Sequence, residues 1–173
     1  IFRSISYKND IVKMDPLEGN LRKALNLGHS IGHVLERAAL DAGMDITHGE
    51  CVCFGTCWEL RFVVEQHDCD PTLLQEFRKL AQRLHMPTDE SHPIWNTLCA
   101  ANLNAIQFDK KTVKQISPTT LKASCSKIDA EHDKIKESTS QSISLCCMRK
   151  RGDFCIQNIA IHDFILFFQR RMT

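Results

Sequence analysis

One segment of the chain constrains its structural class more than any other. It begins with Asp70-Pro71, a helix start signal, because aspartate accepts hydrogen bonds from free backbone N–H groups and proline suits the first helical position. Apolar residues then recur at helical spacing, at Leu73, Leu74, Phe77, Leu80, Ala81 and Leu84. The pattern ends before Pro87, which cannot continue a helix. The segment predicts an amphipathic helix with one face in a core.

The same periodicity recurs on both sides of this segment. Helical spacing covers residues 5–14, 21–40, 48–66 and 93–108, and Asp15-Pro16 predicts a further helix start. Gly28 is expected to break the 21–40 segment in two, and Gly43 to end it. The sequence therefore predicts a mainly α fold.

The C-terminal part has a different pattern. Residues 142–148 and 154–161 are β-prone and flank a turn at Gly152, and residues 163–170 predict a last helix. Between these parts, residues 112–141 are rich in Ser, Thr, Lys and Asp and poor in large apolar side chains, which predicts a polar loop or insertion. We expect a helical domain over 1–111, an insertion over 112–141, and a return to the same domain over 142–173.

Charge and cysteine usage exclude several classes. The net charge is +1 and no apolar run approaches the length of a membrane span, so we expect neither nucleic-acid nor membrane binding, and a cytoplasmic protein. Nine cysteines without zinc-ribbon spacing favour reduced thiols. Cys51, Cys53 and Cys57 could ligate a soft metal, but their apolar helical setting favours core packing. Since the chain begins with Ile rather than Met, we expect a piece of a longer protein.

The stretch "LNLGHSIGHVLE" carries the candidate chemistry. His29 and His33 are one helical turn apart and share a face, about 5–6 Å apart at Cβ. His48 begins the next predicted helix, and three imidazoles suit zinc, with Glu36 or Glu50 as spare acids. Spacing alone leaves two interpretations open, a metal or catalytic site and ordinary helix packing.

Other residues nearby have both a functional and a structural interpretation. Gly28 and Gly32 let another backbone or a ligand approach closely, or serve helix packing alone. Four polar side chains complete the candidate set: Lys8, Arg22, Asn26 and Lys110. They are suited to binding phosphate or carboxylate, or are solvated surface groups.

The stretch "LRKALNLGHSIGHVLE", followed by "HGECVCFG", resembles the C-terminal domain of 3-dehydroquinate synthases of the shikimate pathway. The form "GHSIGH…HGECV" is most similar to the fungal-type version in the pentafunctional AROM polypeptide. The resemblance covers residues 1–111 and resumes more weakly over 142–170. It implies the multi-helix C-terminal domain of the dehydroquinate synthase-like fold with a small terminal β-hairpin, without the NAD-binding α/β domain.

The resemblance also implies roles for single residues. His29 and His48 are expected to bind zinc, and His33 and Glu18 to act in proton transfer. The expected substrate-binding residues are Lys8, Arg22, Asn26, His29, His48 and Lys110. The third zinc ligand and most of the NAD site belong, in the family, to a preceding part that this chain lacks.

The implied reaction converts 3-deoxy-arabino-heptulosonate 7-phosphate to 3-dehydroquinate and phosphate. We expect a homodimer when the enzyme is complete, and no turnover by this chain alone. Two alternatives stay open. One is a related enzyme, either another sugar-phosphate cyclase such as a 2-deoxy-scyllo-inosose synthase or a metal-dependent alcohol dehydrogenase. The other is a non-catalytic helical module that retains the histidines as remnants.

Overall fold

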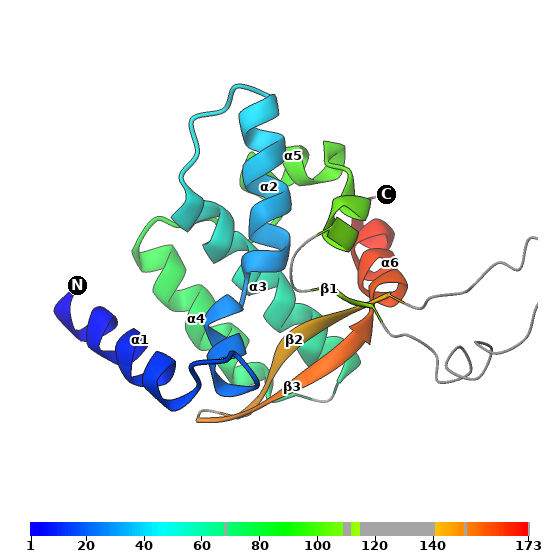
Figure 1. Ribbon diagram of the computed structural model, residues 1–173. Helices are drawn as coiled ribbons and strands as arrows, with labels where there is room; N and C mark the ends of the chain where they lie inside the picture. The colour runs from blue at the N-terminus through cyan, green and yellow to red at the C-terminus, as the bar shows by residue number, and fades with distance from the viewer. Residues whose placement is uncertain (68, 109–111, 115–140, 151, 173) are drawn as a thin grey trace, which may run out of the picture.

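The computed structural model describes residues 1–67, 69–108, 112–114, 141–150 and 152–172. In chain order the elements are α1 (Phe2–Met14), the 3₁₀ helix η1 (Leu21–Asn26), α2 (His29–Asp41), α3 (His48–Gln66), α4 (Pro71–Arg83), α5 (Ile94–Ala100), the 3₁₀ helix η2 (Leu103–Phe108), β1 (Thr112–Lys114), β2 (Gln141–Lys150), β3 (Asp153–Ala160) and α6 (Ile161–Met172). The predicted mainly α fold with a small terminal hairpin is confirmed (Figure 1).

The core lies between α2, α3, α5, α6 and the hairpin. Its largest buried side chains are aromatic and come from two helices, α3 and α6: Phe54, Trp58, Phe62, Phe164 and Phe168. The Trp58 and Trp95 rings stack at 4.8 Å, which joins α3 to α5. Truncating one such buried ring to alanine typically costs about 3–5 kcal/mol. The aromatic cluster is therefore a main source of tertiary stability.

The strands form one antiparallel sheet in the order β1-β2-β3. The predicted hairpin is β2–β3, with Lys150 opposite Asp153 and an irregular register between Met148 and Lys150. The short strand β1, which the sequence did not predict, pairs with residues 141–143 of β2. The remaining part of the predicted insertion, 115–140, lies outside the described residues.

Several predicted boundaries are confirmed. Asp70 caps α4 by accepting a hydrogen bond from the Thr72 N–H at 2.8 Å. Gly28 and Gly43 adopt φ values of 80° and 66°, in the left-handed region where glycine is preferred. Gly28 separates η1 from α2, and Gly43 follows the end of α2.

Two helix predictions were wrong. No helix begins at Asp15, because its carboxylate instead accepts hydrogen bonds from the N–H groups of Gly19, Asn20 and Arg22 and closes a turn. These N–H groups, that of Arg22 first, hold the pKa of Asp15 below its usual value. Residues 93–108 form two helices rather than one, because Ala101 is extended (ψ 147°) between α5 and η2.

Helix α1 differs from the others because it buries none of its residues. In Figure 1 it extends away from the helices that form the core. Phe2, Ile5 and Tyr7 on it are 83%, 53% and 71% exposed. Among the residues that the structure describes, no helix combines the length and apolarity needed to cross a membrane.

Candidate functional site

The candidate site lies where α2 crosses α3, at a point where the backbones of the two helices are in contact. A Cβ atom on Gly28 would overlap Thr56 Oγ1, and one on Gly55 would overlap the Gly28 carbonyl oxygen. A Cβ on Gly32 would lie 3.2 Å from the Val52 Cα. The close approach expected from Gly28 and Gly32 is therefore made by the neighbouring helix. It fixes the spacing of the two helices that carry the histidines.

A buried carboxylate joins the same two helices. Glu59 of α3 is 2% exposed, and its oxygens accept hydrogen bonds from the N–H groups of Gly28 (2.8 Å), Ser30 (3.1 Å) and Ile31 (3.4 Å). The free N–H groups and the positive end of the helix dipole at the start of α2 favour a negative charge there. Sequence reasoning missed Glu59. Its signal was an acidic residue inside an otherwise apolar helical stretch.

The three candidate histidines converge at this crossing. The ring centroids of His29 and His33 are 5.5 Å apart, those of His29 and His48 are 5.5 Å apart, and those of His33 and His48 are 6.1 Å apart. His29 is half-buried, whereas His33 and His48 are exposed. The structure thus brings together side chains from the first turns of α2 and the start of α3.

The two predicted zinc ligands share one hydrogen-bonding feature. Nδ1 of His29 lies 3.2 Å from the Leu27 carbonyl oxygen, and Nδ1 of His48 lies 3.0 Å from Glu36 Oε2. Because both partners are acceptors, these contacts favour a hydrogen on each Nδ1, and in a neutral imidazole the lone pair is then on Nε2. This is the arrangement in which metal-binding histidines are usually held.

The two spare acids have separate roles. Glu36 contacts His48, whereas Glu50 forms a capping box with Thr47 at the start of α3. The Thr47 hydroxyl and backbone N–H donate to Glu50 Oε2 at 2.7 and 2.8 Å and hold the pKa of Glu50 below its usual value. The capping box fixes the first turn of α3, and with it the position of His48.

The histidines fit zinc as a partial ligand set. Zn–N distances of about 2.0–2.1 Å and tetrahedral angles put the ring centres of two bound imidazoles about 5 Å apart. The separation of His29 and His48 is close to that value. Within the described ranges, however, no three His, Cys, Asp or Glu side chains are arranged to hold a metal ion together.

Predicted site residues form a second cluster before α2. The Asn26 side chain donates to Glu18 Oε1 at 2.7 Å, and Arg22 Nε lies 4.0 Å from Glu18 Oε2. Glu18 itself has a left-handed backbone (φ 56°), which turns the chain from α1 toward η1. The cluster joins an acid, a cation and an amide in one partly exposed group.

One predicted residue is not joined to either cluster, and another lies outside the described residues. Lys8 lies exposed on α1, and in the described part of the chain it makes no hydrogen bond or ion pair with the histidines or with Glu18. Lys110 lies outside the described residues.

A cavity of about 470 Å³ opens beside His33. Its lining comes from α2 and from residues 101–106, and includes Ser30, His33, Arg37, Asp41 and Asn102. His33 therefore faces both the other histidines and an open space that can admit a small molecule.

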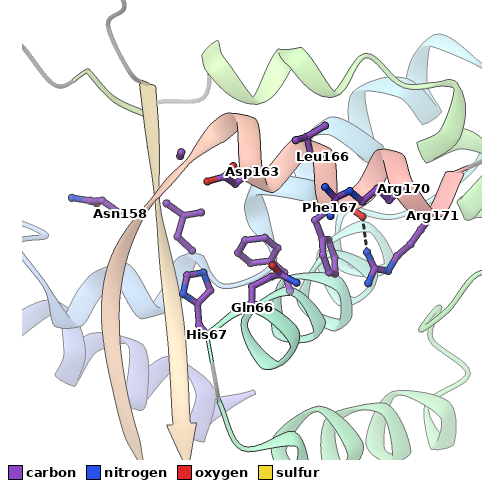
Figure 2. Close-up of a pocket in the computed structure, with 11 residues that line it drawn as sticks. Gln66, His67, Asn158, Asp163, Leu166, Phe167, Arg170 and Arg171 are labelled. Atoms are coloured by element: carbon purple, nitrogen blue, oxygen red, sulfur yellow. Dashed lines mark hydrogen bonds between the residues drawn. The ribbon is translucent and has the colours of Figure 1, made fainter.

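A larger hollow of about 810 Å³ lies between the end of α3, β3 and α6 (Figure 2). Phe62 and Phe167 line it together with polar residues such as His67 and Asp163. Arg171 at its edge donates to the Phe167 carbonyl oxygen at 2.8 Å. Of the predicted site residues that the structure describes, none lines this hollow.

Known proteins match the part of the chain that carries both clusters. Relatives named 3-dehydroquinate synthase include those of Streptococcus equi subsp. equi (32% identical over 69% of this chain and 33% of the relative), Caldanaerobacter subterraneus subsp. tengcongensis (36%, over 63% and 29%) and Pyrobaculum aerophilum (31%, over 64% and 30%). The chain thus spans about a third of the length of these curated relatives. A family model described as "3-dehydroquinate synthase C-terminal" matches residues 1–112. The chain belongs to the 3-dehydroquinate synthase C-terminal family.

Proposed function

We propose that this chain is the metal- and substrate-binding part of a 3-dehydroquinate synthase, a phosphate-eliminating lyase of the shikimate pathway to chorismate and the aromatic amino acids. The reaction converts 3-deoxy-arabino-heptulosonate 7-phosphate to 3-dehydroquinate and phosphate. The observation that carries the proposal is the matched orientation of His29 and His48, whose Nδ1 atoms face Leu27 O and Glu36 Oε2. In this orientation Nε2 is the ring nitrogen of each histidine that would bind the metal ion.

Zinc is the metal that this pair fits, with a third ligand supplied from outside the chain. When bound, zinc polarises an alcohol oxygen of the substrate and lowers its pKa, and NAD accepts the hydride. The contribution of this chain is to hold two imidazoles at fixed spacing. Glu36 keeps His48 in one tautomer, and the carbonyl of Leu27 does the same for His29.

His33 and Glu18 are proposed to move protons. His33 is exposed, lies next to the two proposed ligands and lines the 470 Å³ cavity, so its ring can reach a substrate hydroxyl or phosphate oxygen. General acid–base catalysis of this kind contributes about 10²–10⁴-fold to rate. Glu18 and Asn26 are hydrogen-bonded, so a substrate hydroxyl bound by Asn26 would lie next to the Glu18 carboxylate. Glu18 can then accept a proton from that hydroxyl.

The anionic groups of the substrate are proposed to bind to the cations of the chain. Arg22 lies beside Glu18, where a substrate carboxylate or phosphate can compete for its guanidinium. Lys8 and Lys110 are proposed as further phosphate and hydroxyl contacts. For Lys8 to contact the substrate, the rest of the enzyme must hold the exposed helix α1 against the substrate.

The remaining partners are also proposals. This chain matches about a third of the length of its relatives, and we propose that a part corresponding to the remaining two thirds binds NAD. We propose a cytoplasmic homodimer of the complete enzyme, in the fungal-type form that the histidine motif resembles.

A chimera tests the proposal directly. The matching C-terminal third of the Streptococcus equi relative is replaced by this chain, and phosphate release is measured with NAD and zinc present. We expect release from the heptulosonate substrate, and none from the isolated 173-residue chain under the same conditions. Release from glucose 6-phosphate instead would identify a different sugar-phosphate cyclase.

Two substitutions in the chimera separate the roles of the histidines. His48→Ala is expected to lower zinc content, whereas His33→Ala is expected to lower turnover by about 10²–10⁴-fold with zinc content unchanged. Zinc content is measured by metal analysis of the purified protein. Loss of zinc from the His33→Ala protein would contradict the division of roles.

A further inference from the structure

Two cysteines face each other across the terminal hairpin. The register of β2 and β3 places Cys147 directly opposite Cys155. Directly opposed residues in an antiparallel pair share one face of the sheet and have Cα atoms about 4.5–5.5 Å apart. A disulfide spans Cα separations of about 4.4–6.8 Å. Both thiols are free in the structure, so the pair can form a cross-strand disulfide with little movement of the backbone.

The pair lies next to the irregular part of the hairpin. The register shifts between Met148 and Lys150, one step beyond the two cysteines. A bulge of this kind breaks the regular ladder and bends the strand locally. The strands can therefore adjust to the shorter Cβ separation that a disulfide requires.

The two thiols differ in accessibility and in chemistry. Cys147 is fully buried, and burial raises the pKa of its thiol to about 12. Cys155 is half-buried, and its sulfur accepts a hydrogen bond from Gln157 Nε2 at 3.8 Å. A small reagent from solvent can therefore reach Cys155, whereas Cys147 is covered by the core.

A third thiol lies close to the pair. The Asp70 N–H donates to the Arg149 carbonyl oxygen at 3.2 Å, which fixes Cys69 beside the end of β2. The Cys69 thiol donates to the His67 carbonyl oxygen at 3.7 Å. Cys69 is 5% exposed and, unlike Cys147, is not opposite Cys155 in the sheet. It is a rival partner that an experiment must distinguish.

We propose that Cys155 and Cys147 are an oxidisable dithiol that reacts with small disulfides such as oxidised glutathione. The Cys155 thiolate attacks one sulfur of the reagent and releases one glutathione thiolate, which leaves a mixed disulfide on Cys155. The Cys147 thiol then loses its proton and attacks the Cys155 sulfur, releasing the second glutathione. The protein loses two electrons and two protons, and the reagent disulfide is reduced to two thiols.

Peptide mapping of the whole 173-residue chain tests this without any substitution. The protein is incubated with oxidised glutathione, the remaining thiols are alkylated, and peptides are identified by mass spectrometry. We expect a linked peptide pair joining Cys147 to Cys155, lighter than the two reduced peptides by two hydrogens. A Cys69–Cys155 link, or unlinked Cys155 in alkylated or glutathionylated form, would overturn the proposal.

Two variants sharpen the result. Cys147→Ser should retain a stable glutathione adduct on Cys155, because the resolving thiol is missing. The matched control is Cys99→Ser, which removes an exposed cysteine on α5 and should leave the Cys147–Cys155 link unchanged. Loss of the link in the Cys99→Ser protein would also overturn the proposal. The readout is a peptide mass, so it is independent of whether the proposed lyase activity is found.

Discussion

The two clusters of candidate site residues differ in how the chain supports them. The histidines stand on two helices in backbone contact, joined by the buried Glu59 carboxylate. The Glu18 cluster stands on a turn and a short 3₁₀ helix, next to a helix that buries nothing. The first cluster therefore has its geometry set by the core of this chain. The second is held by local hydrogen bonds such as those of Asp15 and by the contact of η1 with β2.

The largest expected effect follows from Glu59→Ala. The substitution removes three hydrogen bonds and leaves buried N–H groups at the start of α2 unsatisfied, so we expect a loss of about 3–5 kcal/mol in the free energy of unfolding. Urea denaturation measures it. The matched control is Asp41→Ala, which removes an exposed ion pair with Arg37 and should cost less than about 1 kcal/mol. Equal losses in the two proteins would contradict this account of the helix pair.

Gly28→Ala is expected to be next in size. The new Cβ would overlap Thr56, and the alanine would have to adopt a left-handed backbone conformation. We therefore expect the free energy of unfolding, measured by urea denaturation, to fall by about 2–4 kcal/mol. Gly43→Ala separates the two causes, because Gly43 is also left-handed but has open space around its missing Cβ. It should cost only about 1–2 kcal/mol. A Gly28→Ala protein as stable as the Gly43→Ala protein would show that the helices can move apart easily.

A smaller effect is expected on metal binding. Glu36→Gln in the chimeric enzyme weakens the acceptor that orients His48, so zinc affinity should fall about 10–100-fold, equivalent to about 1.4–2.8 kcal/mol. Competition with a chromogenic chelator measures the affinity. Asp41→Asn, on the same helix, is the control and should leave zinc affinity unchanged. An unaltered affinity in the Glu36→Gln protein would remove the main support for His48 as a ligand.

The smallest effect is expected on α1. Ile5→Ala removes a side chain that is 53% exposed and should change the free energy of unfolding by less than about 0.5 kcal/mol. Ile31→Ala, the same substitution at a fully buried position of α2, should cost about 2–5 kcal/mol. Thermal or urea unfolding of both proteins measures the contrast. Similar losses would mean that α1 is packed as firmly as α2.

Much of the fold could be predicted from local signals. Asp70-Pro71, Gly28 and Gly43 mark helix ends through hydrogen bonding and backbone conformation, which depend on a few neighbouring residues. The same local reasoning failed at Asp15, because its carboxylate had two outcomes available, a helix cap and a closed turn. The closed turn includes a left-handed Glu18 (φ 56°), a conformation that the residue type does not predict.

The candidate site was predictable as a set of residues but not as a geometry. The spacing of His29 and His33 follows from the helix period, whereas the position of His48 depends on the crossing of two helices. The role of Glu59 was hidden because its partners are about thirty residues away in sequence. The roles of all these residues, including His29 and His48 as zinc ligands, stay predictions, and Lys110 lies outside the described residues.

The backbone contact of α2 with α3 has a consequence for inherited variation. Every missense change at the codons of Gly28, Gly32 or Gly55 adds at least a Cβ atom at a point where there is little or no room for one. Such an allele would move the two histidine-bearing helices apart, although every histidine would still be present in the sequence. Alleles that lose the proposed zinc binding should therefore include glycine substitutions whose defect is the distance between His29 and His48.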